Sequence, residues 1–136
     1  MIIKSDKMGY DGEKYVMPVW QLDTANYTVT HYNEETHEVE TTPFHAECVR
    51  YHIDSICSKN VDILKDMVNK GEILDYLNKF EEKVNEMINR QVERWKKSDK
   101  DYLEAKELGH NDEEAGILNM LTLQAKEIVY RNTVYI

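Results

Sequence analysis

The sequence predicts an α+β protein, with an N-terminal antiparallel β-hairpin or small sheet followed by a bundle of about four helices. Between residues 10 and 42, β-branched and aromatic residues alternate with polar ones at a period of two, which is typical of half-buried strands. From Pro43 onward the apolar residues recur at the spacing of a helix. The chain has 136 residues, which suits one domain, or one domain carrying a small appendage. We therefore expect a β-rich part over residues 1–42 and a helical part over 43–136.

The β-rich part is expected to contain three short strands, over residues 15–20, 27–32 and 37–41. The last two would form a hairpin that turns at residues 33–36. If Val29 and Val39 share the buried face, they lie opposite each other, and His31 lies opposite His37. This register requires an odd loop running from Tyr32 to Thr36.

The helical part begins with two short predicted helices. Thr42 and Pro43 form a typical helix start, with Thr as the N-cap and Pro at the first helical position, and this helix is expected to run to about Ser58. Asn60 is placed to cap the second helix, and Gly71 is expected to end it, because glycine accepts the left-handed conformation at that position. The residues expected to face inward are Val61, Leu64, Met67 and Val68.

Two longer helices complete the predicted bundle. The third follows an apolar stripe with one polar interruption, Gln91, and consists of Ile73, Leu77, Phe80, Val84, Met87, Gln91 and Trp95. The fourth begins near Asp112 and carries Leu118, Leu121, Ala125, Ile128 and Val129. We expect these two helices to form an antiparallel hairpin. Residues 98–111 between them are expected to be a helical turn or an acidic loop closed by Gly109.

Composition excludes several classes of function. The formal net charge is -9, which argues against binding nucleic acid through phosphate neutralisation. The apolar stretches are far shorter than the roughly 20 residues needed to span a bilayer, and the first residues lack the apolar core of a signal peptide. Two cysteines are too few for a disulfide scaffold. The expectation is a cytoplasmic protein that does not contact membranes.

Histidines and cysteines are concentrated between residues 31 and 57, and they suggest a structural zinc site. On a helix, His45, Cys48 and His52 share one face, and imidazole and thiolate at that spacing can bind tetrahedral zinc. The hairpin would supply His31 and His37 as a cross-strand pair. The favoured set is Cys48 and His52 with one or both hairpin histidines. Such a zinc ion would join the two parts of the chain.

Other interpretations of the same residues stay open. Cys48 can be a small core residue, and the histidines can be exposed or hydrogen-bonded. A catalytic zinc is a further alternative, although the sequence has no His-Glu-x-x-His motif. Nucleophilic catalysis by Cys48 or Cys57 lacks a recognisable oxyanion-hole turn. We therefore expect a protein that is not an enzyme.

Acidic residues form two runs that are candidates for binding a protein partner. The first lies in the hairpin and the second precedes and begins the fourth helix, with seven acids against two lysines. Such runs are usually solvated faces, but they can also dock on a basic surface in place of phosphates. The residues expected to bind the partner are Glu34, Glu35, Glu38, Glu40, Asp99, Asp101, Glu104, Glu107, Asp112, Glu113 and Glu114.

Three segments of the helical part resemble the TnpV family of small proteins carried by transposons and integrative elements. They are residues 69–77, residues 84–92, and a C-terminal set made of Leu118-Asn119, residues 125–129 and Val134-Tyr135. The resemblance extends over about residues 48–136. It implies a helical core and a bacterial mobile-element setting, and it supplies no catalytic residues to carry over.

These observations favour an inhibitor encoded by a mobile element. The chain is expected to bind a host defence protein without catalysis, most concretely as an anti-CRISPR protein that blocks a type II RNA-guided nuclease, whose channel is positively charged. The small size and the acidic charge both agree with an anti-CRISPR protein, which a phage or another mobile element would encode. The alternative is a transposon accessory protein that binds an element recombinase. Both a monomer and a homodimer are compatible with the sequence.

Overall fold

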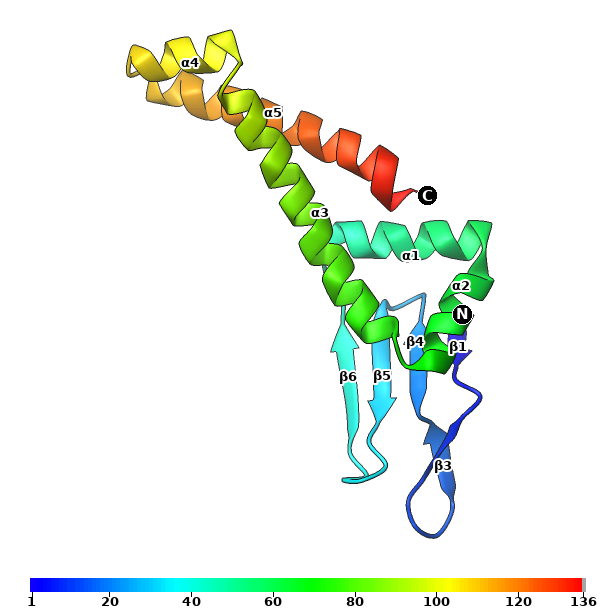
Figure 1. The fold of residues 1–136 in the computed structure, drawn as a ribbon. Helices are drawn as coiled ribbons and strands as arrows, with labels where there is room; N and C mark the ends of the chain where they lie inside the picture. Colours follow the sequence, from blue (N-terminus) through cyan, green and yellow to red (C-terminus); the bar gives the residue numbers. More distant parts are fainter. Residues whose placement is uncertain (136) are drawn as a thin grey trace. The chain divides into compact units, whose positions relative to one another are not determined.

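The computed structural model describes residues 1–135, and it has the α+β architecture expected from the sequence, with strands first and helices after them (Figure 1). The change from strands to helices falls between Pro43 and Glu47. The chain forms two compact units, which are described separately below. The first consists of residues 1–81 with Tyr135, and the second of residues 82–134, so that the boundary between them lies inside a helix.

Antiparallel strands make up the β-part of the first unit. The larger sheet has the order β1-β4-β5-β6, and a separate hairpin joins β2 to β3. Strands β1 and β2 were not expected, because segments of three residues are too short to show alternation. The bounds are β1 Ile2–Lys4, β2 Met8–Tyr10, β3 Tyr15–Pro18, β4 Trp20–Asp23, β5 Thr28–Tyr32 and β6 Val39–Pro43.

The register of the β5–β6 hairpin differs from the predicted one. Tyr32 lies opposite Val39, His31 opposite Glu40 and Val29 opposite Thr42. The apolar pattern was misleading because Tyr32 is the residue that is buried, whereas Val39 is 52% exposed.

The turn of this hairpin explains the altered register. The side-chain oxygen of Asn33 accepts hydrogen bonds from the backbone N–H groups of Glu35 and Thr36. His37 closes the turn in the left-handed region, with a φ of 62°. The loop is therefore longer than the predicted one, and His37 does not lie across from His31.

The predicted helix start at Thr42 and Pro43 is wrong. Both residues end β6, and the N–H of Phe44 continues the ladder by donating to the carbonyl of Tyr27 at 2.9 Å. Proline is tolerated here because β6 is an edge strand, where one side of the backbone needs no partner. The first helix, α1, begins at Glu47 and ends at Lys59.

Helices α1, α2 (Val61–Lys70) and the start of α3 (Ile73–Lys96) complete the first unit. Helix α2 packs against β1 and β4 and buries Leu64, Met67 and Val68, as predicted. Gly71 ends it in the left-handed conformation with a φ of 71°, which confirms the expected stop. The core of this unit lies between the sheet and the helices, and its fully buried members include Leu22, Val29, Val49, Ile53, Leu64, Val68, Ile73 and Leu77.

The second unit consists of the rest of α3, α4 (Lys100–Glu107), α5 (Asn111–Val129) and a short π-helical turn, η1 (Tyr130–Val134). The acidic segment after α3 is therefore a helix rather than a loop. Helix α4 packs along α5, so the connection between the two long helices is itself a helix that contacts the second of them. Among the described residues, no helix is both long and apolar enough to cross a membrane.

Candidate partner-binding site

His52 is a structural residue of the first unit. It is 1% exposed, and its ring stacks on Phe80 with a centroid distance of 3.8 Å and an interplanar angle of 7°. Its Nε2 lies 2.7 Å from the hydroxyl oxygen of Tyr76. Cys48 is buried one turn earlier on α1, and burial raises the pKa of its thiol above the ordinary value. The shared face predicted for Cys48 and His52 is therefore part of the core.

The other histidines of the predicted zinc set lie on different elements. His31 stacks on Trp20 across the β4–β5 pair at 4.0 Å. His37 is exposed in the hairpin turn, and His45 is exposed before α1, where its Nδ1 lies 3.5 Å from the Arg50 guanidinium. Residues 1–135 contain no group of three or more His, Cys, Asp or Glu side chains arranged to hold a metal ion. The geometry thus lends no support to the zinc hypothesis.

The acidic residues of the hairpin are partly used within the fold. Glu34 forms an ion pair with Lys7 at 3.0 Å and accepts a hydrogen bond from the backbone N–H of Tyr10. The hydrogen bond from Lys7 is the main reason why the pKa of Glu34 is lowered. Glu35, Glu38 and Glu40 are exposed. The hairpin therefore offers fewer free carboxylates than its composition implied.

Residues 99–114, which we call the acidic tip, contain helix α4 and the first turn of α5. Their seven acids and two lysines give a local charge of -5. Three of the carboxylates hold the tip together. Asp99 caps α4 by accepting from the N–H of Tyr102 at 2.9 Å, Glu114 accepts from the Tyr102 hydroxyl at 3.3 Å, and Glu113 lies 3.3 Å from His110.

The remaining carboxylates of the acidic tip face solvent. Four are exposed and form no ion pair within the described part of the chain, and they are Asp101, Glu104, Glu107 and Asp112. Tyr102 and Ala105 anchor α4 with exposures of 3% and 1%. The tip therefore presents unpaired negative charge on α4 and on the first turn of α5, and this backbone needs no further ordering to bind a basic surface.

The sequence did not single out an exposed aromatic pair on the β2–β3 hairpin. Tyr10 and Tyr15 lie opposite each other with ring centroids 5.2 Å apart, and Tyr15 is 70% exposed. Aromatic side chains at this exposure are typical of interface residues. The signal available in the sequence was the pair of tyrosines on either side of the turn at Asp11–Lys14.

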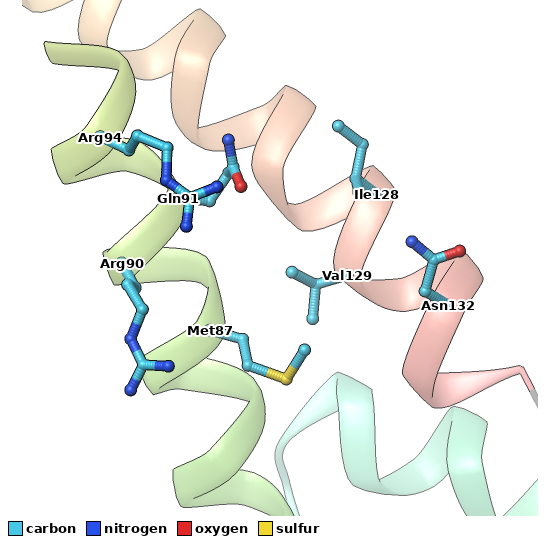
Figure 2. A pocket seen from close by; sticks show the side chains of 7 residues that line it. All are labelled: Met87, Arg90, Gln91, Arg94, Ile128, Val129 and Asn132. Atoms are coloured by element: carbon cyan, nitrogen blue, oxygen red, sulfur yellow. The ribbon is translucent and has the colours of Figure 1, made fainter.

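A recess of ≈ 270 Å³ lies between α3 and α5 in the second unit. Figure 2 shows Met87 and Gln91 of α3 and Val129 of α5 extending into the space between the helices. This position explains the polar interruption of the α3 stripe, because Gln91 meets the recess and not a closed core. The lining also includes Arg90, Arg94, Ile128 and Asn132, and the Arg90 guanidinium is paired with the Glu86 carboxylate.

Comparisons with protein-family models, with curated proteins and with solved structures give no significant match to this chain.

Proposed function

We propose that this chain is a mobile-element-encoded inhibitor that binds a host defence protein without catalysis, most concretely an anti-CRISPR protein that blocks a type II RNA-guided nuclease. The observation that carries the proposal is the acidic tip. Of its four exposed, unpaired carboxylates, three lie on α4, which Tyr102 fixes, and Asp112 lies in the first turn of α5. The resemblance of the helical part to the TnpV family supplies the mobile-element setting.

The proposed mechanism is electrostatic competition. RNA-guided nucleases hold nucleic acid in a positively charged channel. Carboxylates on a rigid helix would occupy positions that phosphates otherwise take, and long-range attraction would speed the encounter. The proposal requires no metal ion and no turnover.

The test is guided DNA cleavage by a panel of type II nucleases, with and without the protein. We expect the wild-type chain to slow cleavage by at least one of them. A variant with Asp101→Asn, Glu104→Gln and Glu107→Gln should inhibit about tenfold less well, since each exposed charge contributes a few tenths to about 1 kcal/mol. Raising the salt concentration should weaken inhibition by the wild type, because it shortens the Debye length.

A matched control separates the acidic tip from net charge. The variant Glu13→Gln, Asp62→Asn and Glu82→Gln removes the same number of charges at exposed positions outside the tip. It should inhibit like the wild type. Unchanged cleavage across the whole panel would refute the anti-CRISPR form of the proposal, and equal loss in both variants would refute the tip as its site.

A second candidate is a transposon accessory protein that binds an element recombinase, and the exposed aromatic hairpin favours it. Tyr10 and Tyr15 form a surface that electrostatic competition does not use. Co-purification with a recombinase from a transposon or integrative element would test it. Binding should be lost in Tyr10→Ser with Tyr15→Ser and retained in the neutralised tip variant.

A further inference from the structure

Helix α5 is apolar on two opposite sides, and one of them faces solvent. From Ala115 to Ala125 it contains no charged residue, in a chain that is 32% charged. Leu121, Ala125 and Val129 face the interior of the unit. On the outward side, Met120 and Leu123 are 53% and 66% exposed. Exposed apolar side chains that gather on one face and are rimmed by polar residues mark interaction surfaces, so the outward face is expected to have a partner.

Gly116 lies on the same outward face, one turn before Met120. No atom lies within 4 Å of the place where its Cβ would stand, so nothing within the described chain requires a glycine there. A helix with glycine in its interior is less stable than the same helix with alanine. Glycine at this position leaves the backbone exposed, so that another chain can approach it closely.

Charged residues of opposite sign flank this face at its two ends. Counting at helical spacing, the face consists of Asp112, Gly116, Met120, Leu123 and Glu127, and Arg131 of η1 continues it, with its guanidinium 3.4 Å from the Glu127 carboxylate. If a second copy lies antiparallel on this face, Met120 meets Leu123, Gly116 meets Glu127 and Asp112 meets Arg131. Each of these pairs occurs twice, because the two copies are related by a two-fold axis. Apolar side chains thus meet in the centre, and opposite charges meet at both ends.

We propose that α5 pairs with α5 of a second copy of this chain, antiparallel and centred between Met120 and Leu123. An uncharged centre with a charged rim is the usual anatomy of a protein interface. The charges decide the occupant and the direction, since a parallel pair would place Asp112 against Asp112, which is unfavourable. This inference goes beyond the proposed function and does not depend on it.

Sedimentation equilibrium of the full chain, from about 1 µM to about 1 mM, tests the pairing. The wild type should show a reversible monomer–dimer equilibrium. Leu123→Glu should weaken dimerisation at least about tenfold, because it buries a carboxylate at the centre. Leu108→Glu is the matched control, since Leu108 is 59% exposed but lies at the end of α4. It should leave the dissociation constant unchanged.

A charge exchange tests the direction of the pair. Asp112→Arg and Arg131→Asp should each weaken dimerisation several-fold, and the double variant should recover most of the loss because the end pairs are then reversed but still opposite in sign. Far-UV circular dichroism of each variant checks that the helices are intact. A monomer at every concentration would overturn the proposal, and so would equal losses in Leu123→Glu and Leu108→Glu. A double variant no better than its singles would overturn the antiparallel register.

Discussion

Two glycines show how differently the same residue acts in this fold. At Gly9, a Cβ would stand 2.2 Å from Cδ1 of Tyr32, so the buried ring depends on the missing side chain. At Gly116, a Cβ would meet nothing within 4 Å. Glycine is therefore required by internal packing at the first position and not at the second. The effect of each glycine on stability can be measured in its own unit by tryptophan fluorescence, because Trp20 lies in the first unit and Trp95 in the second.

We expect Gly9→Ala to lower the free energy of unfolding by about 1–3 kcal/mol, since the extra methyl overpacks the Tyr32 ring. Gly116→Ala should raise it by about 0.5–1 kcal/mol through helix propensity. Urea unfolding followed by tryptophan fluorescence measures both, with Trp95→Phe as the background for Gly9→Ala and Trp20→Phe for Gly116→Ala. The measurement is made in dilute protein, so that association does not contribute. Equal effects at the two positions would contradict this account.

The hydrogen bond between His52 and Tyr76 gives a further prediction at the residue scale. Tyr76→Phe leaves the buried imidazole nitrogen without this partner, so it should lower the free energy of unfolding by about 1–2 kcal/mol at neutral pH. Burial raises the pKa of the Tyr76 phenol above 10.0. Above about pH 10 the unfolded chain loses this proton before the folded chain does, so the stability of the wild type falls.

The difference in the free energy of unfolding between the wild type and Tyr76→Phe should therefore narrow as the pH rises above about 10, because phenylalanine has no proton to lose. Urea unfolding at several pH values checks this. Tyr15→Phe is the control, since Tyr15 is 70% exposed and should change little. If the difference in the free energy of unfolding stayed constant with pH, the raised pKa of the buried Tyr76 phenol would be contradicted.

At the scale of elements, α4 depends on its N-cap. Asp99→Ala removes the side-chain hydrogen bond to the N–H of Tyr102 and should destabilise α4 by about 1 kcal/mol. Amide hydrogen exchange across α4 should then be about fivefold faster. Asp101→Ala removes a charge from the same turn without removing the cap, so its exchange should change less. Similar exchange in both variants would show that the cap contributes nothing.

A helix or strand could be predicted from the sequence where a long apolar repeat defines it. Helix α3 was expected from its stripe, and Ile73, Leu77, Phe80 and Val84 are buried as that stripe implies. The shorter elements depend on tertiary contacts that sequence spacing does not contain. Strand β6 keeps Thr42 and Pro43 because the ladder with β5 continues past them, although the pair resembles a helix start.

At the scale of the whole molecule, the position of the charged clusters was easier to predict than which residues contact each other. The acidic tip was identified from the sequence because a local count of charges needs no knowledge of the fold. The zinc set required the hairpin histidines to lie beside Cys48 and His52, and spacing alone predicted neither the altered register nor the burial of His52. Zinc binding stays a prediction. The outward face of α5 was missed for the same reason, since only the fold shows that Met120 and Leu123 are 53% and 66% exposed.

The two edges of the larger sheet have a consequence for how the protein behaves when concentrated. Strand β1 spans three residues and ends at the exposed Lys4, and β6 carries Glu40 and ends at Pro43, which has no N–H to donate. Short strands, charges and proline at an edge prevent a strand of another molecule from extending the sheet. Fibrous aggregation through the sheet is thereby disfavoured. The protein should consequently stay in solution at the millimolar concentrations used for magnetic resonance.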